Sequence, residues 1–400
     1  MFRFLIDAKT KHDKKSIISQ TILTILVMLT IACIIIFSVI KIFSINTTKL
    51  FIPYVIAVVL MAMMNALVRG LGKIKLYSLS NFILSVLTIL LNVFLILFTN
   101  LKVDGLLLSV IIANFAMILF LSIRLNLINY INPKLMNKKL LKEMISYSLP
   151  LIPHSLSWTI INLSDIQIIS HFMGESSVGI YSNVSNRFPT IINTVYNYFA
   201  VAWKESAAKA LHDSDSGKYF NKIYVSLRDL VYSATIVVIA MSPFVFAVLI
   251  KNQQYAEAYL YIPILVFSVY FSNMASFYGG IFSAYKKTKT IGTTTAVSAV
   301  INLIINFAFI KFIGLYAAAI STLVSSLFLY SYRKKKVYEL VYLKHSRNMQ
   351  YTILITLVVF LAYYSGNMIF KIISLMFAII YAVMMNKETI KMFTGRFIKK

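Results

Sequence analysis

Twelve long apolar runs limit what this chain of 400 residues can fold into. A helix needs about 20 mainly apolar residues to cross the hydrocarbon core of a bilayer. Only 13% of the residues are charged and the mean hydropathy is +0.80, whereas about a quarter of a soluble domain is charged. The sequence therefore predicts an all-α membrane protein with about twelve transmembrane helices. We place them at about 19–42, 51–69, 76–98, 105–126, 146–170, 178–203, 223–250, 258–284, 291–310, 313–331, 350–366 and 369–386.

The basic residues alternate between the connections of these runs. Of the 39 lysines and arginines, 32 fall on every second connection or at a terminus, six fall on the other connections, and Arg187 lies inside a run. The positive-inside rule then predicts a multi-pass membrane protein with both termini in the cytoplasm. The net charge of +26 is thus explained by a cytoplasmic face beside anionic lipid, and we expect no nucleic-acid partner.

Cofactor chemistry has little support in the sequence. The single cysteine, Cys33, lies in an apolar run and cannot form a disulfide within the chain. The five histidines are scattered and show no metal-ligand spacing, so we expect neither a bound metal nor a cofactor.

Two segments resemble each other and indicate an internal repeat. In 76–126, Asn92 precedes Gly105 by 13 residues, and in 291–331, Asn302 precedes Gly314 by 12. Four runs precede the second copy after the long basic loop, but only two precede the first, so the first unit is two helices short. An even number of helices in each unit predicts parallel repeats. We expect a four-helix N-terminal bundle in 1–143, which is an incomplete repeat, and a six-helix bundle in 144–331. A basic loop and a C-terminal transmembrane hairpin complete the chain in 332–400.

Four segments resemble a known family in the order and spacing that the family has. They are FRFLIDAKTKHDKKSIIS at 2–19, YSLPLIPHSLSWTIINLSDIQII at 147–169, VGIYSNVSNRFPTIINTVYNYFAVAW at 178–203 and KKTKTIGTTTAVSAVINLIINFAFIKFIGLYAAAISTLVSS at 286–326. The chain resembles the polysaccharide transporter branch, of the O-antigen flippase type, of the multidrug/oligosaccharidyl-lipid/polysaccharide exporter superfamily. Family members carry two helices before the region where this chain starts, so we expect that the chain lacks its first hairpin. The family's seventh helix commonly has an acidic–basic pair where this chain reads Asp165-Ile166, without the basic member.

Two ionisable residues lie deep in predicted spans, where charge is costly and commonly functional. Asp165 lies about 9 Å and Arg187 about 14 Å below the outer helix ends, at 1.5 Å per residue. They either form a buried salt bridge, or Arg187 faces a cavity and binds substrate phosphates with its planar guanidinium. Asp165 is the acidic residue placed to couple transport to protons or sodium.

The runs at 146–170 and 178–203 are rich in polar side chains, and placing these side chains against lipid would cost free energy. They either line a hydrated cavity that binds sugar hydroxyls or bond to other helices. The candidates for the cavity are Asn162, Tyr181, Asn186, Asn193 and Asn197, in addition to Asp165 and Arg187. Near the cytoplasmic side, we interpret Trp203 as an anchor at the membrane interface. We interpret Arg228 and Asp229 either as an ion pair on the surface or as a site that binds a lipid headgroup.

The resemblance implies a flippase that moves undecaprenyl-pyrophosphate-linked oligosaccharide, an O-antigen or capsule repeat unit, across the bacterial cytoplasmic (inner) membrane by alternating access. Membrane lipids, a polysaccharide polymerase and glycosyltransferases are the partners that it implies. A cation-coupled drug antiporter of the same superfamily is the alternative, although one aspartate beside one arginine disfavours a cationic substrate. A membrane polysaccharide polymerase or glycosyltransferase is the third hypothesis. The loops are short and show no convincing catalytic carboxylates, so we expect that the protein is not an enzyme.

Overall fold

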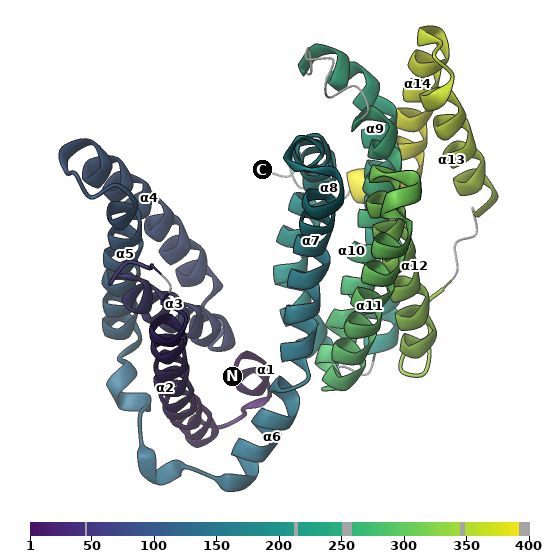
Figure 1. Cartoon of the computed structure of the whole chain (residues 1–400). Coiled ribbons are helices and arrows are strands. Elements are labelled where there is room, and N and C mark those ends of the chain that lie inside the picture. The colour runs from purple at the N-terminus through teal and green to yellow at the C-terminus, as the bar shows by residue number, and fades with distance from the viewer. Residues whose placement is uncertain (45, 212–214, 250–257, 345–348, 392–400) are drawn as a thin grey trace. The chain divides into compact units, whose positions relative to one another are not determined.

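The computed structural model describes residues 1–44, 46–211, 215–249, 258–344 and 349–391. Helices and short turns make up these residues, and no strand occurs among them (Figure 1). The chain divides into two compact units, Met1–Ser146 and Tyr147–Lys400. The prediction of an all-α protein is therefore confirmed.

The first unit is built around α3. Its contacts are with α1, α2, α4 and α5, and α4 also packs against α5. The connection after α5 is bonded to the start of α2, because Ser16 and Ser19 donate to the carbonyls of Leu135 and Tyr130. The helices are α1 (Phe2–Asp7), α2 (Lys11–Ile42), α3 (Phe51–Gly70), α4 (Ile74–Phe98), α5 (Lys102–Leu125) and α6 (Lys138–Ser148), with short 3₁₀ turns at Leu127–Tyr130 and Pro133–Leu135.

The second unit is built around α10, and most residues of this helix are buried. This helix contacts α8, α9, α11 and α12, while α13 and α14 form a hairpin that packs on α9 (Figure 1). The helices are α7 (Leu151–Met173), α8 (Glu175–Ala210), α9 (Ser216–Leu249), α10 (Ile262–Ala284), α11 (Thr288–Ile313), α12 (Leu315–Val337), α13 (Met349–Tyr364) and α14 (Met368–Met385).

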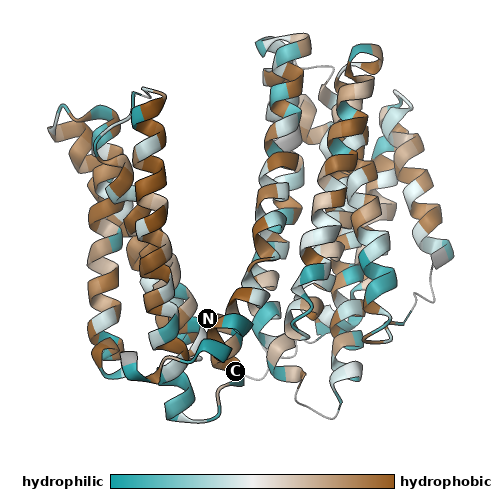
Figure 2. Ribbon diagram, turned by 60° about the horizontal axis from the view of Figure 1, so that its bottom comes forward, coloured by the Kyte–Doolittle hydropathy of each residue, from teal (hydrophilic) through white to brown (hydrophobic). Residues whose placement is uncertain are grey.

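The membrane character of the helices follows from what they leave exposed. In the most apolar window of α2 only 6% of the residues are buried, and Phe37 and Ile42 are among its exposed side chains. Apolar colour runs along the helices, and hydrophilic residues gather towards their ends (Figure 2). Exposed apolar surface of this extent needs lipid to cover it, so the chain is a multi-pass membrane protein.

Each predicted run falls largely within a helix, but fewer than twelve of the described helices are long and apolar enough to span a membrane. Among the described residues, nine helices are long and apolar enough to cross a membrane. The helices α7 and α8 are more polar, and α13 has 16 residues. The twelve spans therefore stay a prediction, while α1 and α6 are short helices that the apolar runs did not reveal.

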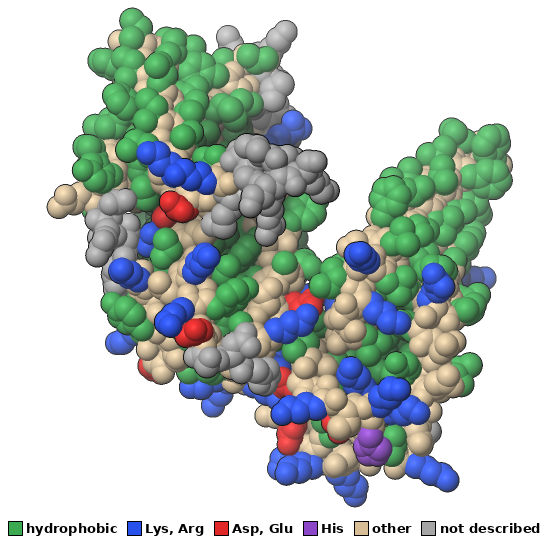
Figure 3. All heavy atoms as spheres, turned by 180° about the vertical axis from the view of Figure 1, so that it is seen from behind, with side chains coloured by type: hydrophobic (Ala, Val, Ile, Leu, Met, Phe, Trp, Pro, Cys, Tyr) green, Lys and Arg blue, Asp and Glu red, His purple; other side chains and the backbone are tan. Residues whose placement is uncertain are grey.

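The basic side chains of the first unit gather towards one end of its helices, and the opposite end is covered by hydrophobic side chains (Figure 3). This arrangement is the asymmetry on which the predicted cytoplasmic orientation depends. The orientation itself stays a prediction.

An asparagine–serine hydrogen bond occurs in each of the two segments of the proposed repeat. Asn92 of α4 accepts a hydrogen bond from Ser109 of α5. Asn302 of α11 donates to Ser321 of α12 at 3.2 Å. In each segment an asparagine of the first helix thus bonds to a serine of the second.

Two residues that we placed at the cytoplasmic interface are buried instead. Trp203 is 2% exposed, stacks on Phe277 with ring centroids 4.5 Å apart and donates to the Phe277 carbonyl at 3.0 Å. A Cβ at Gly280 would lie 2.3 Å from the indole nitrogen, so only glycine permits this contact. The interface-anchor interpretation of Trp203 was wrong because helix packing supplied a partner for its N–H group.

Arg333 is the second correction, since we counted it with the basic loop. It is 1% exposed and lies within α12. Its guanidinium donates to Thr294, Thr295 and the carbonyls of Ala275 and Ile291 at 2.7 to 3.1 Å. The cation is thus held by neutral oxygens of α10 and α11, and no carboxylate pairs with it among the described residues.

Candidate functional site

Two tight turns bring polar residues of four helices to one depth in the second unit. Gly174 joins α7 to α8 with φ +82°, and Gly314 joins α11 to α12 with φ +56°. Such positive φ values suit glycine. Asp165 and Tyr181 lie nine residues before and seven after Gly174, so their side chains meet across the helix pair.

The second turn is spaced in the same way. Asn306 and Thr322 each lie eight residues from Gly314. At 1.5 Å per residue, this places the four side chains about 10–14 Å from the helix ends, near the middle of a core about 30 Å thick. The two glycine turns therefore gather these residues at mid-membrane depth.

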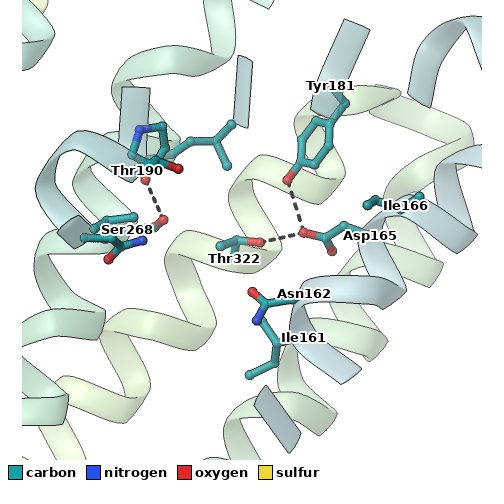
Figure 4. Close-up of a pocket in the computed structure, with 12 residues that line it drawn as sticks. Ile161, Asn162, Asp165, Ile166, Tyr181, Thr190, Ser268 and Thr322 are labelled. Carbon is teal, nitrogen blue, oxygen red and sulfur yellow. Dashed lines mark hydrogen bonds between the residues drawn. The ribbon is translucent and has the colours of Figure 1, made fainter. Parts of the chain in front are cut away.

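Asp165 is the centre of the resulting polar cluster. It is 6% exposed and lies on the buried stripe of α7 formed by Ser157, Ile161, Asp165 and Ile169. Its Oδ2 accepts from the Tyr181 hydroxyl at 3.1 Å and from the Thr322 hydroxyl at 2.9 Å (Figure 4). Its Oδ1 accepts from the Asn306 amide nitrogen at 2.7 Å. Three neutral donors therefore surround the carboxyl group.

Two asparagines of α11 extend the cluster. Asn302 donates to Ser321 and to Thr322, at 3.2 and 3.3 Å. Asn306 is fully buried, and its Oδ1 has no hydrogen-bond partner. A buried acceptor without a partner is uncommon and calls for a physical explanation, such as an ion or a water molecule. The cluster therefore has one unused buried acceptor, the Oδ1 of Asn306, beside a single carboxyl group.

A cavity of about 140 Å³ opens beside Asp165. It lies within the second unit, and Figure 4 shows Asn162, Tyr181 and Thr322 around it. The lining residues are Ile161, Asn162, Asp165, Ile166, Tyr181, Pro189, Thr190, Asn193, Leu265, Ser268, Val269 and Thr322.

The structure brings together four of the seven predicted site residues. Asn162, Asp165, Tyr181 and Asn193 line the cavity. Arg187 and Asn197 are exposed on α8 and do not line it, and the side chain of Asn186 lies outside the described residues.

The predicted salt bridge between Asp165 and Arg187 is not formed among the described residues. Asp165 bonds to Tyr181, Thr322 and Asn306 instead. This interpretation was wrong because depth alone does not fix the direction in which a side chain leaves its helix.

Sequence reasoning missed the residues supplied by α11 and α12. Asn302, Asn306 and Thr322 form half of the cluster, and Ser268 of α10 completes the cavity wall. Asn302 and Asn306 are four residues apart in an apolar run and lie on one helix face, which was the available signal.

The comparison with protein families identifies a family for this chain. A sequence profile of the family described as polysaccharide biosynthesis protein matches residues 3–203. No curated protein matches the sequence.

Several solved structures share the fold. A MATE protein in complex with MaL6 has 14% identity, covers 84% of this chain and 83% of that chain, and gives a TM-score of 0.70. An outward-facing multidrug resistance MATE transporter of the MOP superfamily has 16% identity, coverages of 84% and 82%, and a TM-score of 0.69. A MOP superfamily transporter from Pyrococcus furiosus, described as having a binding pocket of reverse polarity, has 14% identity, coverages of 84% and 82%, and a TM-score of 0.68. The chain therefore has the MATE fold.

Proposed function

The chain belongs to the polysaccharide biosynthesis protein family, and on that premise we propose that it is a flippase for undecaprenyl-pyrophosphate-linked oligosaccharide. Family and fold are those of membrane transporters, not of enzymes. The proposed cargo is an O-antigen or capsule repeat unit, moved across the bacterial cytoplasmic membrane by alternating access. Polymerases and glycosyltransferases of the same biosynthesis are the proposed partners.

The exposed position of Arg187, without an ion-pair partner among the described residues, is the observation that carries this proposal. Its side chain is exposed on a helix of the membrane domain and makes no ion pair among the described residues. A charge against lipid costs about 2.5–3.5 kcal/mol on insertion scales, so an unpaired arginine is expected to face water or an anion. A guanidinium offers a planar fork of donors that matches phosphate oxygens. In the proposal, Arg187 binds the pyrophosphate.

The side-chain amide groups of α7 and α8 suit the sugar part of the cargo. Asn162 and Asn193 line the polar cavity, and Asn197 is exposed four residues further along α8. Side-chain amides both donate and accept hydrogen bonds, as sugar hydroxyls do. We assign them to the oligosaccharide, and Asn186 remains part of this proposal.

Asp165 is proposed as the coupling residue. A buried carboxyl group among hydroxyl and amide oxygens can take up a proton or contribute to an oxygen-ligated sodium site, and the unpartnered Oδ1 of Asn306 supports the second use. Loading and unloading of this cluster changes the bonds between the α7–α8 and α11–α12 pairs. In the proposal that change drives transport.

A drug antiporter is the second candidate, because multidrug transporters share the fold. A cationic drug is bound best by carboxylates that are free to pair with it. In the described cavity, Asp165 is the acidic residue and its oxygens already accept three hydrogen bonds. This lining favours the sugar–phosphate cargo.

The test measures surface polysaccharide in a host that lacks its own flippase and expresses variants of this protein. Two charge-assisted bonds to phosphate are each worth about 1.5–3 kcal/mol, so Arg187→Ala is expected to lower export at least about 100-fold. Arg187→Lys keeps the charge but loses the fork, and about tenfold lower export is expected. Arg124→Ala removes an exposed arginine at the end of α5 and is the matched control. Export at the control level by Arg187→Ala, at equal membrane abundance, contradicts the phosphate role.

A further inference from the structure

A buried arginine in α12 has no carboxylate partner among the described residues and no part in the proposed transport site. Arg333 is 1% exposed, and its guanidinium donates only to hydroxyl and carbonyl oxygens. Arg228 differs, because it is 13% exposed and pairs with Asp229 at 2.8 Å, so this pair is largely buried and is not the surface pair that we expected. A buried charge is costly unless it is compensated, and an arginine held by neutral oxygens within a membrane helix calls for a functional explanation.

Arg333 belongs to a second polar layer, which lies further from the glycine turns than the Asp165 cluster does. Thr295 and Arg333 each lie 19 residues from Gly314, whereas the residues that bond to Asp165 lie seven or eight residues from their turns. His154 of α7 is in the same layer, since its Nδ1 lies 2.7 Å from the Thr295 hydroxyl. At 1.5 Å per residue, this layer is about 28 Å from the turns, near the opposite edge of a core about 30 Å thick.

Buried polar side chains connect the two layers along α11 and α12. Ser298 donates to the Ser325 carbonyl at 2.8 Å, and Ser325 donates to the Thr322 carbonyl at 3.1 Å. Asn302 donates to the Thr322 hydroxyl, which in turn donates to Asp165. We call these residues the polar file, and every member except the partly exposed Thr322 is buried: Thr295, Ser298, Asn302 and Asn306 of α11, with Ser321, Thr322 and Ser325 of α12. The polar file leads from the carboxyl group to the second layer.

A polar file of this kind is a hazard in a transporter that is coupled to a cation. The coupling site must open to one side of the membrane at a time, so a standing path to one face would let the cation pass without transport. A fixed arginine closes such a path, because its charge repels protons and metal cations. At an effective dielectric constant of about 20, two unit charges one or two helical turns apart repel enough to lower occupancy at least about tenfold.

We propose that Arg333 seals the polar file against cations, between Asp165 and the membrane face at the start of α11 and the end of α12. The proposal rests on the coupling role proposed for Asp165. A guanidinium suits a permanent seal because it stays charged at physiological pH. Its four hydrogen bonds fix it between α10 and α11. A carboxylate beside it would cancel the repulsion, which accounts for the neutral oxygens that hold it.

The experiment measures passive cation entry into liposomes that contain the purified full chain and no cargo. A trapped pH-sensitive or sodium-sensitive dye reports entry down an imposed gradient, at equal amounts of reconstituted protein. The wild type is expected to be tight, and Arg333→Met, which removes the charge, is expected to leak at least about tenfold faster. Arg333→Lys keeps the charge and is expected to stay tight, although it cannot make all four hydrogen bonds and is the less stable variant.

Two controls distinguish a leak through the polar file from a packing defect. Leu329 is 1% exposed and lies one turn before Arg333 on α12, so Leu329→Ala opens a void without removing a charge and is expected to stay tight. Asp165→Asn removes the carboxyl group at the end of the polar file, and adding it to Arg333→Met is expected to slow the leak at least tenfold.

Three results overturn the proposal: a tight Arg333→Met variant, an equal leak in Arg333→Lys, or a leak that the added Asp165→Asn leaves unchanged. The assay contains no cargo, so its outcome is separate from that of the proposed function. The expected pattern of leaks in a protein that does not translocate lipid-linked oligosaccharide supports the seal and contradicts only the proposed cargo.

Discussion

Replacing Asp165 with leucine removes the acceptor of three hydrogen bonds while leaving a side chain of similar size in the buried stripe of α7. The hydroxyls of Tyr181 and Thr322 and the amide of Asn306 then lose their shared partner. Asp165→Asn is the matched change, since it removes the charge but keeps one acceptor oxygen. Comparing the two variants separates the structural role of the cluster from its charge.

The expected magnitudes follow from the contacts. A buried donor left without a partner costs about 1–3 kcal/mol, and the Thr322 hydroxyl can turn to a carbonyl of its own helix. We therefore expect Asp165→Leu to lower the free energy of unfolding by about 3 kcal/mol. In Asp165→Asn, the oxygen still accepts from both hydroxyls, and the new N–H group donates to the unpartnered Oδ1 of Asn306 once that amide turns over. The expected loss is about 1 kcal/mol.

The assay is thermal unfolding of the purified protein in detergent, followed by surface export in cells. At about 2–4 °C per kcal/mol, the apparent Tm is expected to fall by about 6–12 °C for Asp165→Leu and by less than about 4 °C for Asp165→Asn. Export is expected to be lost in both, because neither variant carries the coupling charge. Equal Tm values for the wild type and Asp165→Leu would refute the reasoning about the cluster.

Two further predictions concern stability and use the same measurement. Gly174→Ala and Gly314→Ala are each expected to cost about 1–2 kcal/mol because of their positive φ values, whereas Gly179→Ala in the interior of α8 is expected to be neutral or slightly stabilising; an unchanged Tm for the two turn variants contradicts this. Arg333→Lys is expected to lower the Tm more than Arg333→Met, since the lysine nitrogen cannot reach all four acceptors and methionine removes the buried charge; the opposite order contradicts it.

The sequence was most informative about the helices. Apolar runs of span length are a strong signal, because an unsatisfied backbone is excluded from the hydrocarbon core. The ends of the helices were less predictable: α8 continues to Ala210 and α12 to Val337, because polar helical turns extend beyond the apolar part. The short helix α6 has too few apolar residues to be found by the same signal.

The site was half predictable. Depth in a predicted span identified Asp165, and the many polar residues of 178–203 identified Tyr181. The glycine turn between α7 and α8 then brings these two side chains together. The contribution of α11 and α12 depends on which helix pairs pack together, and that information lies in long-range contacts. The same limitation explains Arg333, whose basic neighbours in the sequence resemble a loop although α10 and α11 enclose its side chain.

The most direct test of the proposed function is transport by the purified protein in liposomes. Fluorescent undecaprenyl-pyrophosphate-linked oligosaccharide is placed in one leaflet, and its appearance in the other is measured with a membrane-impermeant quencher. We predict translocation by the wild type and at least about 100-fold slower translocation by Arg187→Ala, consistent with loss of two phosphate bonds. We also predict no uptake of a cationic dye such as ethidium. Uptake of the dye without translocation of the lipid-linked oligosaccharide would contradict the account and identify a drug transporter.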